Sequence, residues 1–380
     1  MNTYKIVILG SSGSGKTTLL ASMYYRLSIQ SVDTGFFLRV SPEQGYILNS
    51  RYQQMVVNRR WPEATPLREA STWDFTCMIP GKNSHVYSAL QFSYLDYAGE
   101  RLMYPPGHDL NIAFEDSLKD ADALLGLIDG RKMLSLMQNE PTSDRSVDLD
   151  LSNMLPLMQM SQSPVHFVIT KWDLLQDKYS LGEVRDRLLK LAEFQEFVRN
   201  HIRRFTVRLI PVSAVGLGFA KLQSDGFMRK VPGAHIQPFQ VEVPLACVLP
   251  DQFQAQIARL KEKEAMRRGK SISSAPNLTI WDLLGTGIGN VIRTMRGFLL
   301  GKYQFEDAQL AKLIQFVELG ARTKGEDIAK EVENLRFEQT SSLESVRDER
   351  TALAHIITSF LYLVSKLELD FPESNLSKFR

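Results

Sequence analysis

The sequence predicts an α/β protein in which a mostly parallel sheet is covered by helices and followed by an α-helical C-terminal region. Three observations support this prediction. Short apolar runs recur along about the first 216 residues, and most are followed by a polar loop or a helical pattern. A glycine-rich loop joins the first run to the first helix. Beyond about residue 241, apolar residues recur at helical spacing.

The composition is that of an ordinary globular protein. The chain has 380 residues, of which 44% are apolar and 23% charged, and this length allows about two or three domains. The formal net charge of +2 is too small to indicate nucleic acid as a partner, so we predict no direct nucleic-acid binding. The two cysteines, Cys77 and Cys247, lie inside apolar runs, which favours buried thiols in a reducing compartment.

Neither a secretory signal nor a membrane span is expected. The N-terminus passes straight into the first apolar run, and no uninterrupted apolar run of about 18 residues follows. The six histidines are scattered, without the spacing of metal ligands. We therefore expect a cytoplasmic protein.

The first functional signal is the segment GSSGSGKTTL, which fits the phosphate-binding pattern G-x-x-x-x-G-K-[ST] between a strand-like run and a helical pattern. In this context, backbone N–H groups and a helix N-terminus face the phosphates of a nucleotide. Gly10, Gly13 and Gly15 suit the positive φ angles and close backbone approach that such a loop needs. We predict that Lys16 contacts the β- and γ-phosphates and that Thr17 binds Mg²⁺. The predicted phosphate-loop residues are Gly10, Ser11, Ser12, Gly13, Ser14, Gly15, Lys16, Thr17 and Thr18.

Two further strands are expected over STWDFTCMIP and VYSALQFSYLDYAGE, joined by the turn GKNS. The second strand ends in Asp96-Tyr97-Ala98-Gly99-Glu100. A carboxylate at a strand end beside the phosphate loop can hold the Mg²⁺ shell through water, and a glycine three residues later can turn its N–H toward a γ-phosphate. We therefore assign Asp96 to the metal and Gly99 to γ-phosphate sensing.

The signal for the base follows two nearly continuous apolar runs, ADALLGLIDG and PVHFVITKWD. The second run stops in Thr170-Lys171-Trp172-Asp173. The Asp173 carboxylate can accept hydrogen bonds from the N1–H and N2 amino groups of guanine, which adenine cannot offer, while the stem of Lys171 packs on the ring. The next run, TVRLIPVSAVG, places Ser213 and Ala214 where a backbone N–H could reach the guanine O6.

Four segments, each at the end of a predicted strand, resemble in this order the motifs of the translation-factor and Ras-like class of P-loop GTPases. They are Gly10 to Thr17, Asp96 to Gly99, Thr170 to Asp173, and Ser213-Ala214. The resemblance covers about residues 1–260. It implies a three-layer P-loop GTPase domain that binds GTP or GDP with Mg²⁺ and hydrolyses GTP. Two shorter stretches, NRRWPEATP and QPFQVEVPL, resemble the double-GTPase families of prokaryotic conflict systems. This narrower resemblance implies a setting in prokaryotic, antiviral defence or conflict signalling.

Two positions depart from the pattern of the class. Thr170 stands where asparagine is commoner, which predicts softer selectivity for guanine. Glu100 stands where Ras-like proteins have a water-orienting glutamine. Its carboxylate could accept a proton from the attacking water, but it also adds negative charge near the γ-phosphate. We therefore predict slow intrinsic hydrolysis, and a partner's arginine as a way to accelerate it.

The segment between the phosphate loop and Asp96 contains an insertion. Lys16 and Asp96 lie 80 residues apart, more than a minimal Ras-like domain needs, and YILNSRYQQMVV within this segment has a helical pattern. The threonine that binds Mg²⁺ and senses the γ-phosphate should precede the next strand, which leaves Thr65 and Thr72; the double-GTPase resemblance favours Thr65. Three nearby arginines form either a cis arginine finger or, as we favour, a solvated basic patch. They are Arg59, Arg60 and Arg68.

The rest of the chain is expected to be helical. We divide it into a GTPase domain at 1–262, a linker at 263–277 and an α-helical domain at 278–380. The stretch 278–301 has an apolar side, which either packs in a core, as we favour, or lies on a membrane surface. The terminal PESNLSKFR is expected to fray. The switch regions and the C-terminal helices are expected to contact a protein effector or companion protein.

Together these observations predict a Mg²⁺-dependent, GTP-binding molecular switch that hydrolyses GTP slowly. The alternatives are a non-hydrolysing GTP-binding scaffold and an ATP-using P-loop kinase or transferase. The predicted catalytic residues are Lys16, Thr65, Gly99 and Glu100, and the predicted metal ligands are Thr17, Thr65 and Asp96. The predicted nucleotide-binding residues beyond the phosphate loop are Thr170, Lys171, Asp173, Ser213 and Ala214.

Overall fold

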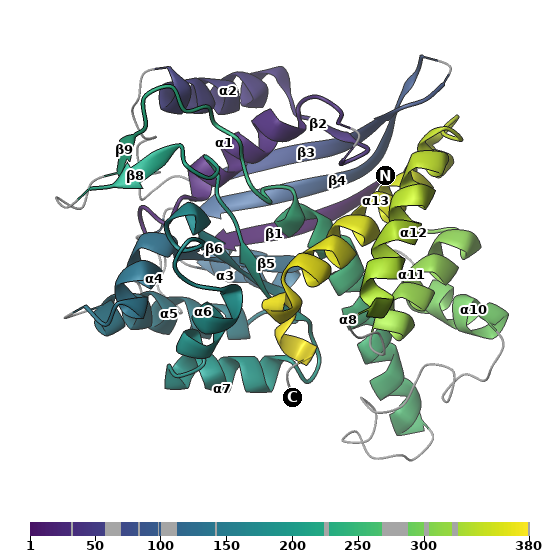
Figure 1. The fold of residues 1–380 in the computed structure, drawn as a ribbon. Helices are drawn as coiled ribbons and strands as arrows, with labels where there is room; N and C mark the ends of the chain where they lie inside the picture. The colour runs from purple at the N-terminus through teal and green to yellow at the C-terminus, as the bar shows by residue number, and fades with distance from the viewer. Residues whose placement is uncertain are drawn as a thin grey trace.

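The computed structural model describes residues 1–31, 33–57, 70–82, 84–97, 99, 112–140, 143–223, 228–267, 288–299, 304–320 and 326–378. Within this part, seven strands form one twisted sheet with helices on both faces, and two more strands form a small separate sheet (Figure 1). The predicted α/β class, with a helical C-terminal region, is confirmed.

The large sheet has the strand order β2-β3-β4-β1-β5-β6-β7. β3 runs antiparallel to β2 and β4, and the other neighbouring pairs are parallel, so the predicted antiparallel hairpin strand is confirmed. The strands of this sheet are β1 (Asn2–Leu9), β2 (Phe37–Arg39), β3 (Ala70–Pro80), β4 (Val86–Tyr97), β5 (Ala123–Asp129), β6 (Val165–Thr170) and β7 (Val207–Pro211). The short strands β2, β8 (Ala220–Leu222) and β9 (Met228–Lys230) have no counterpart among the strands predicted from the sequence.

Alternating residues of β1 supply two apolar cores, one on each face of the sheet. Tyr4, Ile6 and Ile8 join one core, and Val7 and Leu9 join the other, as the two-residue period of a strand requires. The helices of the first core include α1 (Lys16–Leu27), α8 (Val243–Arg267) and α13 (Glu349–Asp370). Those of the second are α3 (Ile112–Asp120), α4 (Gly130–Met137), α5 (Ser143–Gln159), α6 (Leu181–Leu188) and α7 (Ala192–His201).

The insertion after α1 forms a helix, as its pattern predicts. This helix, α2 (Pro42–Val56), begins with Pro42 in its first turn and is capped by the Ser41 side chain, which accepts a hydrogen bond from the Gln44 N–H. It lies beside α1 at the β2–β3 edge of the sheet (Figure 1). The rings of Tyr25 and Tyr52 stack between the two helices with centroids 3.7 Å apart.

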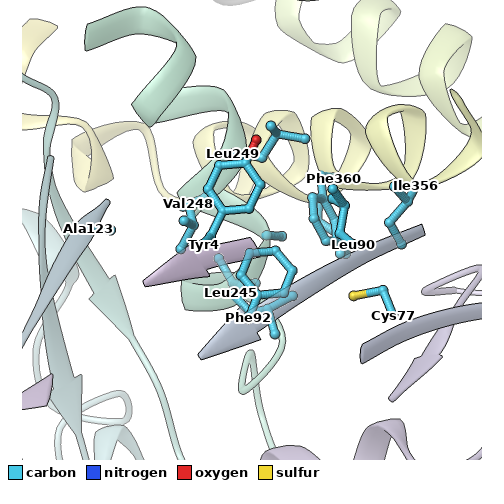
Figure 2. Close-up of a cluster of buried hydrophobic side chains, with 14 of the residues drawn as sticks. Tyr4, Cys77, Leu90, Phe92, Ala123, Leu245, Val248, Leu249, Ile356 and Phe360 are labelled. Carbon is cyan, nitrogen blue, oxygen red and sulfur yellow. The ribbon is translucent and has the colours of Figure 1, made fainter. Parts of the chain in front are cut away.

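The C-terminal helices share a core with the sheet. Figure 2 shows Ile356 and Phe360 of α13 over Leu90 and Phe92 of β4, beside Tyr4 and three residues of α8. The predicted linker at 263–277 begins inside a helix, because α8 continues to Arg267, and residues 268–277 lie outside the described part. The remaining C-terminal helices are α10 (Ile288–Leu299), α11 (Asp307–Gly320) and α12 (Glu326–Leu343).

Two C-terminal helices pack apolar side chains against the rest of the protein. Among the described helices, α13 alone is long and apolar enough to cross a membrane, but 72% of its most apolar window is buried. We therefore interpret α13 as a core helix. Of the stretch 278–301, residues 288–299 are described, and there Val291 and Met295 face the core.

The end of the chain is docked on the sheet, so the expected fraying is wrong through residue 378. Two short 3₁₀ turns, Pro372–Ser374 and Leu376–Lys378, follow α13. Leu376 is buried, and Asn375 forms an isolated bridge with Arg208 of β7. The segment is held because it supplies both an apolar anchor and backbone pairing.

Candidate nucleotide-binding site

The phosphate loop connects β1 to α1 with two glycines in left-handed conformations. Gly13 has a φ of +78° and Gly15 a φ of +96°, which confirms the expectation for these two positions. Gly10 does not have a positive φ, so that part of the prediction is wrong. It is needed for a different reason: a Cβ there would lie 2.6 Å from the Ser14 Oγ and 3.0 Å from the Leu127 Cβ.

Lys16 lies inside its own loop. The Lys16 ammonium donates to the backbone carbonyls of Gly10 at 2.7 Å and Ser11 at 3.2 Å, and the residue is 7% exposed. Burial lowers its pKa, while the nearby carboxylates of Asp96 and Asp150 oppose that shift. The lysine is therefore a desolvated cation at the start of α1, where anions are favoured.

Asp96 is a buried carboxylate to which no described residue donates a hydrogen bond. It lies beside Ile8 in the register of β4 on β1, and it is fully buried. Neither of its carboxylate oxygens has a hydrogen-bond partner in the described part of the chain. Burial raises its pKa, and the positive charges of Lys16 and Arg51 act in the opposite direction. Burying a carboxylate costs free energy unless a cation or a hydrogen-bond donor contacts it. The chemistry of Asp96 therefore fits a Mg²⁺ site.

Gly99 lies directly against the phosphate loop. A Cβ at this position would lie 2.4 Å from the Ser12 nitrogen and 2.6 Å from the Ser11 carbonyl carbon. Both of these atoms belong to the backbone and cannot yield as a flexible side chain would, so the contact requires glycine. The structure thus brings Lys16, Asp96 and Gly99 to one edge of the sheet, as their positions in the sequence predict.

The remaining switch residues are not all described. Thr65 and Glu100 lie outside the described residues, together with Arg59, Arg60 and Arg68. The other threonine candidate, Thr72, lies within β3 opposite Leu95, and its carbonyl accepts a hydrogen bond from the Gln44 side chain. Thr72 is therefore part of the sheet. The assignment of Thr65, which lies outside the described residues, stays a prediction.

The end of β6 is tied to the phosphate loop by two side chains. The Thr170 hydroxyl lies 2.8 Å from the Ser14 carbonyl and 3.2 Å from the Ile128 carbonyl, and can donate to either. The Lys171 ammonium donates to the Gly13 carbonyl at 3.1 Å. Thr170 stands where asparagine is commoner in the class, but its hydroxyl is also a hydrogen-bond donor. It can therefore still link the end of β6 to the phosphate loop.

Asp173 is oriented by a chain of hydrogen bonds. The Gly216 N–H donates to the Ser213 hydroxyl at 2.9 Å, and that hydroxyl donates to Asp173 Oδ1 at 2.6 Å. Burial raises the Asp173 pKa, and the hydrogen bond from Ser213 opposes this shift. The Ser213 N–H donates to the Phe239 carbonyl, so of the two residues predicted to contact O6 through an N–H, only Ala214 can serve.

Two aspartates near the phosphate loop were not predicted from the sequence. Asp150 of α5 accepts hydrogen bonds from the Ser11 hydroxyl at 2.8 Å and the Lys132 ammonium at 2.7 Å. Asp129, the last residue of β5, accepts a hydrogen bond from the Lys171 ammonium at 2.7 Å. A signal existed for Asp129, since it ends an apolar strand as Asp96 does. Asp150 lies on a helix 139 residues from its Ser11 partner, in no recognisable motif.

The comparison with known families agrees with this geometry. The model of the Double-GTPase 2 family matches residues 5–231, which is more than half of the 380 residues. The match includes the phosphate loop and the strand ends that carry Asp96, Asp173 and Ser213, and it stops before α8. No curated protein gives a significant match to the chain. The chain belongs to the Double-GTPase 2 family, and its matched region is a GTP-binding P-loop domain.

Proposed function

We propose that this protein is a Mg²⁺-dependent GTP switch that hydrolyses GTP slowly and signals to a protein partner. The observation that carries the proposal is the buried carboxylate of Asp96 next to the phosphate loop, to which no described residue donates a hydrogen bond. An isolated buried charge costs several kcal/mol unless it is compensated, so it is retained where a ligand supplies the compensation. A Mg²⁺ ion accompanying a nucleotide triphosphate is such a ligand.

The phosphates would be held by the loop and by Lys16. Backbone N–H groups of the phosphate loop and the start of α1 would favour the β-phosphate, while the Lys16 ammonium would exchange its carbonyl partners for phosphate oxygens. Thr17 and Asp96, with Thr65 as the proposed switch ligand, would hold Mg²⁺, which neutralises charge on the β- and γ-phosphates when bound.

The base would be read by Asp173 and Ala214. Since the Ser213 hydroxyl binds Asp173 Oδ1, the second oxygen of this carboxylate is the one best placed to accept from the guanine N1–H and N2 groups. The Ala214 N–H would donate to O6. A purine with the opposite donor pattern would leave these half-buried groups without a partner on the base, which is the basis of the proposed preference for GTP over ATP.

Hydrolysis and switching would depend on Gly99 and Glu100. The Gly99 N–H would contact the γ-phosphate and move when that group is lost, and Glu100 would accept a proton from the attacking water. The negative charge of Glu100 near a phosphate makes slow turnover the expected result. The family membership supports a setting in prokaryotic conflict signalling. We further propose a cytoplasmic location, and the C-terminal helices, of which α13 packs on α8 and β4, as the surface that contacts a partner.

The test is a titration of the purified protein with fluorescent GTP and ATP analogues, with and without Mg²⁺, followed by a turnover assay. Asp173→Ala should lose the preference for GTP, whereas Asp177→Ala, an exposed aspartate four residues later, should keep it. Slow release of phosphate by the wild-type protein is expected. Equal affinity for GTP and ATP in the wild type would overturn the proposal, and tight GTP binding without turnover would favour the scaffold alternative.

A further inference from the structure

A residue outside the predicted motifs stands between the base site and the phosphate site. Asp129 ends β5 directly opposite Thr170 in the register of β6, and its side chain is 9% exposed. Its two carboxylate oxygens have different partners. Oδ1 accepts from the Arg131 N–H and caps α4, and Oδ2 accepts from the Lys171 ammonium at 2.7 Å.

Asp129 fixes one conformation of a flexible side chain. Lys171 is one of four described non-glycine residues with a positive φ, at 52°, and its side chain is 33% exposed. A lysine of that exposure has many rotamers available, so its direction must be set by its partners. Those partners are Asp129 Oδ2 and the Gly13 carbonyl, which hold the ammonium between the end of β5 and the phosphate loop.

The backbone next to Asp129 packs directly on the end of β6. A Cβ on Gly130 would lie 2.1 Å from the Thr170 carbonyl oxygen and 2.8 Å from that of Lys171. The first turn of α4 therefore packs on the end of β6 with no side chain between them. Because Asp129 caps this same turn, its carboxylate is anchored beside Lys171.

We propose that Asp129 is a positioning residue for guanine-nucleotide binding, which holds Lys171 in the conformation that lays its stem along the base and ties the base site to the phosphate loop. This inference rests on the proposed GTP-binding function. It adds a role for β5, a strand that none of the motifs predicted from the sequence includes. The role is carried by the charge of Asp129, since the cap needs only an oxygen acceptor.

The substitution Asp129→Asn separates these two roles. Asparagine caps a helix about as well as aspartate, so α4 should keep its N-terminus, but an amide cannot form the ion pair with Lys171. We expect the dissociation of a fluorescent GDP analogue to accelerate by about fivefold or more, with an unchanged urea midpoint for the nucleotide-free protein. The matched control is Asp186→Asn, which removes an exposed aspartate that pairs with Arg185 at 2.7 Å and should leave dissociation unchanged.

A double-mutant cycle with Lys171→Met tests whether Asp129 acts through Lys171. If it does, Asp129→Asn should add little to the dissociation rate once Lys171 is already methionine. Additive effects of the two substitutions would overturn the proposal, as would a wild-type dissociation rate in Asp129→Asn. A lower urea midpoint of Asp129→Asn together with a lower affinity for GDP would also overturn the proposal, because Asp129 would then have a structural role.

The same experiment separates the failure of this inference from failure of the proposed function. If the wild-type protein prefers GDP to ADP and Asp129→Asn does not change its dissociation, the positioning role fails and the GTP-binding function stands. If the wild-type protein shows no preference for the guanine nucleotide, the proposed function fails and the positioning role fails with it.

Discussion

Two buried aspartates at opposite ends of the same sheet have opposite environments. Asp96, at the carboxyl end of β4, has no hydrogen-bond partner in the described part of the chain. Asp251 of α8, over the amino ends of β6 and β7, accepts two hydrogen bonds from Arg208, at 2.5 and 2.7 Å, and lies 2.9 Å from His166 Nε2. Burial would raise the pKa of either carboxyl, but the Arg208 guanidinium and His166 leave the Asp251 pKa lowered, whereas the Asp96 pKa is raised.

We interpret this difference as that between the proposed ligand site and a structural joint. Around Arg208 the charges are matched within the protein, since Glu368 of α13 accepts from Arg208 at 2.8 Å and from Lys378 at 2.7 Å. This network joins β7, α8, α13 and the C-terminal turns. At the other end of the sheet, no described residue forms a hydrogen bond with the Asp96 carboxylate, which is consistent with the proposed Mg²⁺ site.

The largest expected effect is at the structural joint. Arg208→Met would leave Asp251 and Glu368 buried without their shared cation, so the free energy of unfolding should fall by about 3–5 kcal/mol in urea titrations. The control Arg204→Met removes an exposed arginine paired with Glu262 at 3.1 Å and should cost less than about 1 kcal/mol. Similar losses in the two variants would remove the distinction between the two kinds of ion pair.

The next effect concerns the contact between Gly99 and the phosphate loop. Gly99→Ala places a methyl group against the backbone of Ser12, so the loop or the strand end must move, and GTP affinity should fall by about tenfold or more. Gly289→Ala in α10 adds a methyl group that meets nothing within 4 Å. That control should keep GTP affinity and gain up to about 1 kcal/mol of stability. An unchanged affinity in Gly99→Ala would show that the contact is dispensable.

A smaller effect is expected from pH, through histidines that are buried neutral. His355 of α13 donates from Nε2 to the Gly35 carbonyl at 2.9 Å and lies 2.8 Å from the Ser342 hydroxyl. Burial lowers its pKa, which the bond to Gly35 opposes, and burial likewise lowers the pKa of His201. Because a lowered histidine pKa favours the neutral form in the folded state, stability is full above the unfolded value of about 6.5 and declines as pH falls below it.

Urea midpoints measured between pH 5 and pH 8 check this expectation. His355→Gln should reduce the loss of stability on the acid side, while His85→Gln, in the exposed β3–β4 turn, should leave it as in the wild type. A flat profile in the wild-type protein would contradict a neutral buried His355.

The smallest effect is at Thr170. Thr170→Val removes the hydroxyl that reaches the Ser14 carbonyl, and we expect a loss of about 1 kcal/mol in GDP binding by calorimetry. Thr206→Val is the matched control, because the buried Thr206 hydroxyl has no hydrogen-bond partner in the described residues. That variant should be as stable as the wild type or more so. Equal effects of the two changes would mean that the hydroxyl of Thr170 does not hold the loop.

The sequence was sufficient for the features that depend on local patterns. The longer strands of the large sheet are strong apolar runs, and the phosphate loop, Asp96, Gly99 and Asp173 each occupy a strand end, so their approximate meeting point follows from the topology of parallel strands. Strand β2 was missed because it is three residues long, and the β8–β9 pair for the same reason.

The partners of the site residues could not be predicted because they come from distant parts of the chain. Asp129 and Lys171 are 42 residues apart, and Ser213 and Asp173 are 40 apart, so neither pair has a spacing that reveals a contact. The docking of α13 on β4 likewise depends on packing between segments more than 250 residues apart, such as Phe92 and Phe360. The sequence predicted helices in this part of the chain but not the surface that α13 covers.

The most direct test of this account compares Asp96→Asn with Asp251→Asn in thermal unfolding with and without Mg²⁺ and GDP. Without ligand, Asp96→Asn should be at least as stable as the wild type, and the stabilisation that Mg²⁺ adds to bound nucleotide should disappear. Asp251→Asn should be destabilised by several kcal/mol but keep the response to Mg²⁺. An Asp96→Asn protein that is strongly destabilised without ligand and still responds to Mg²⁺ would contradict the assignment of Asp96 to the ligand site.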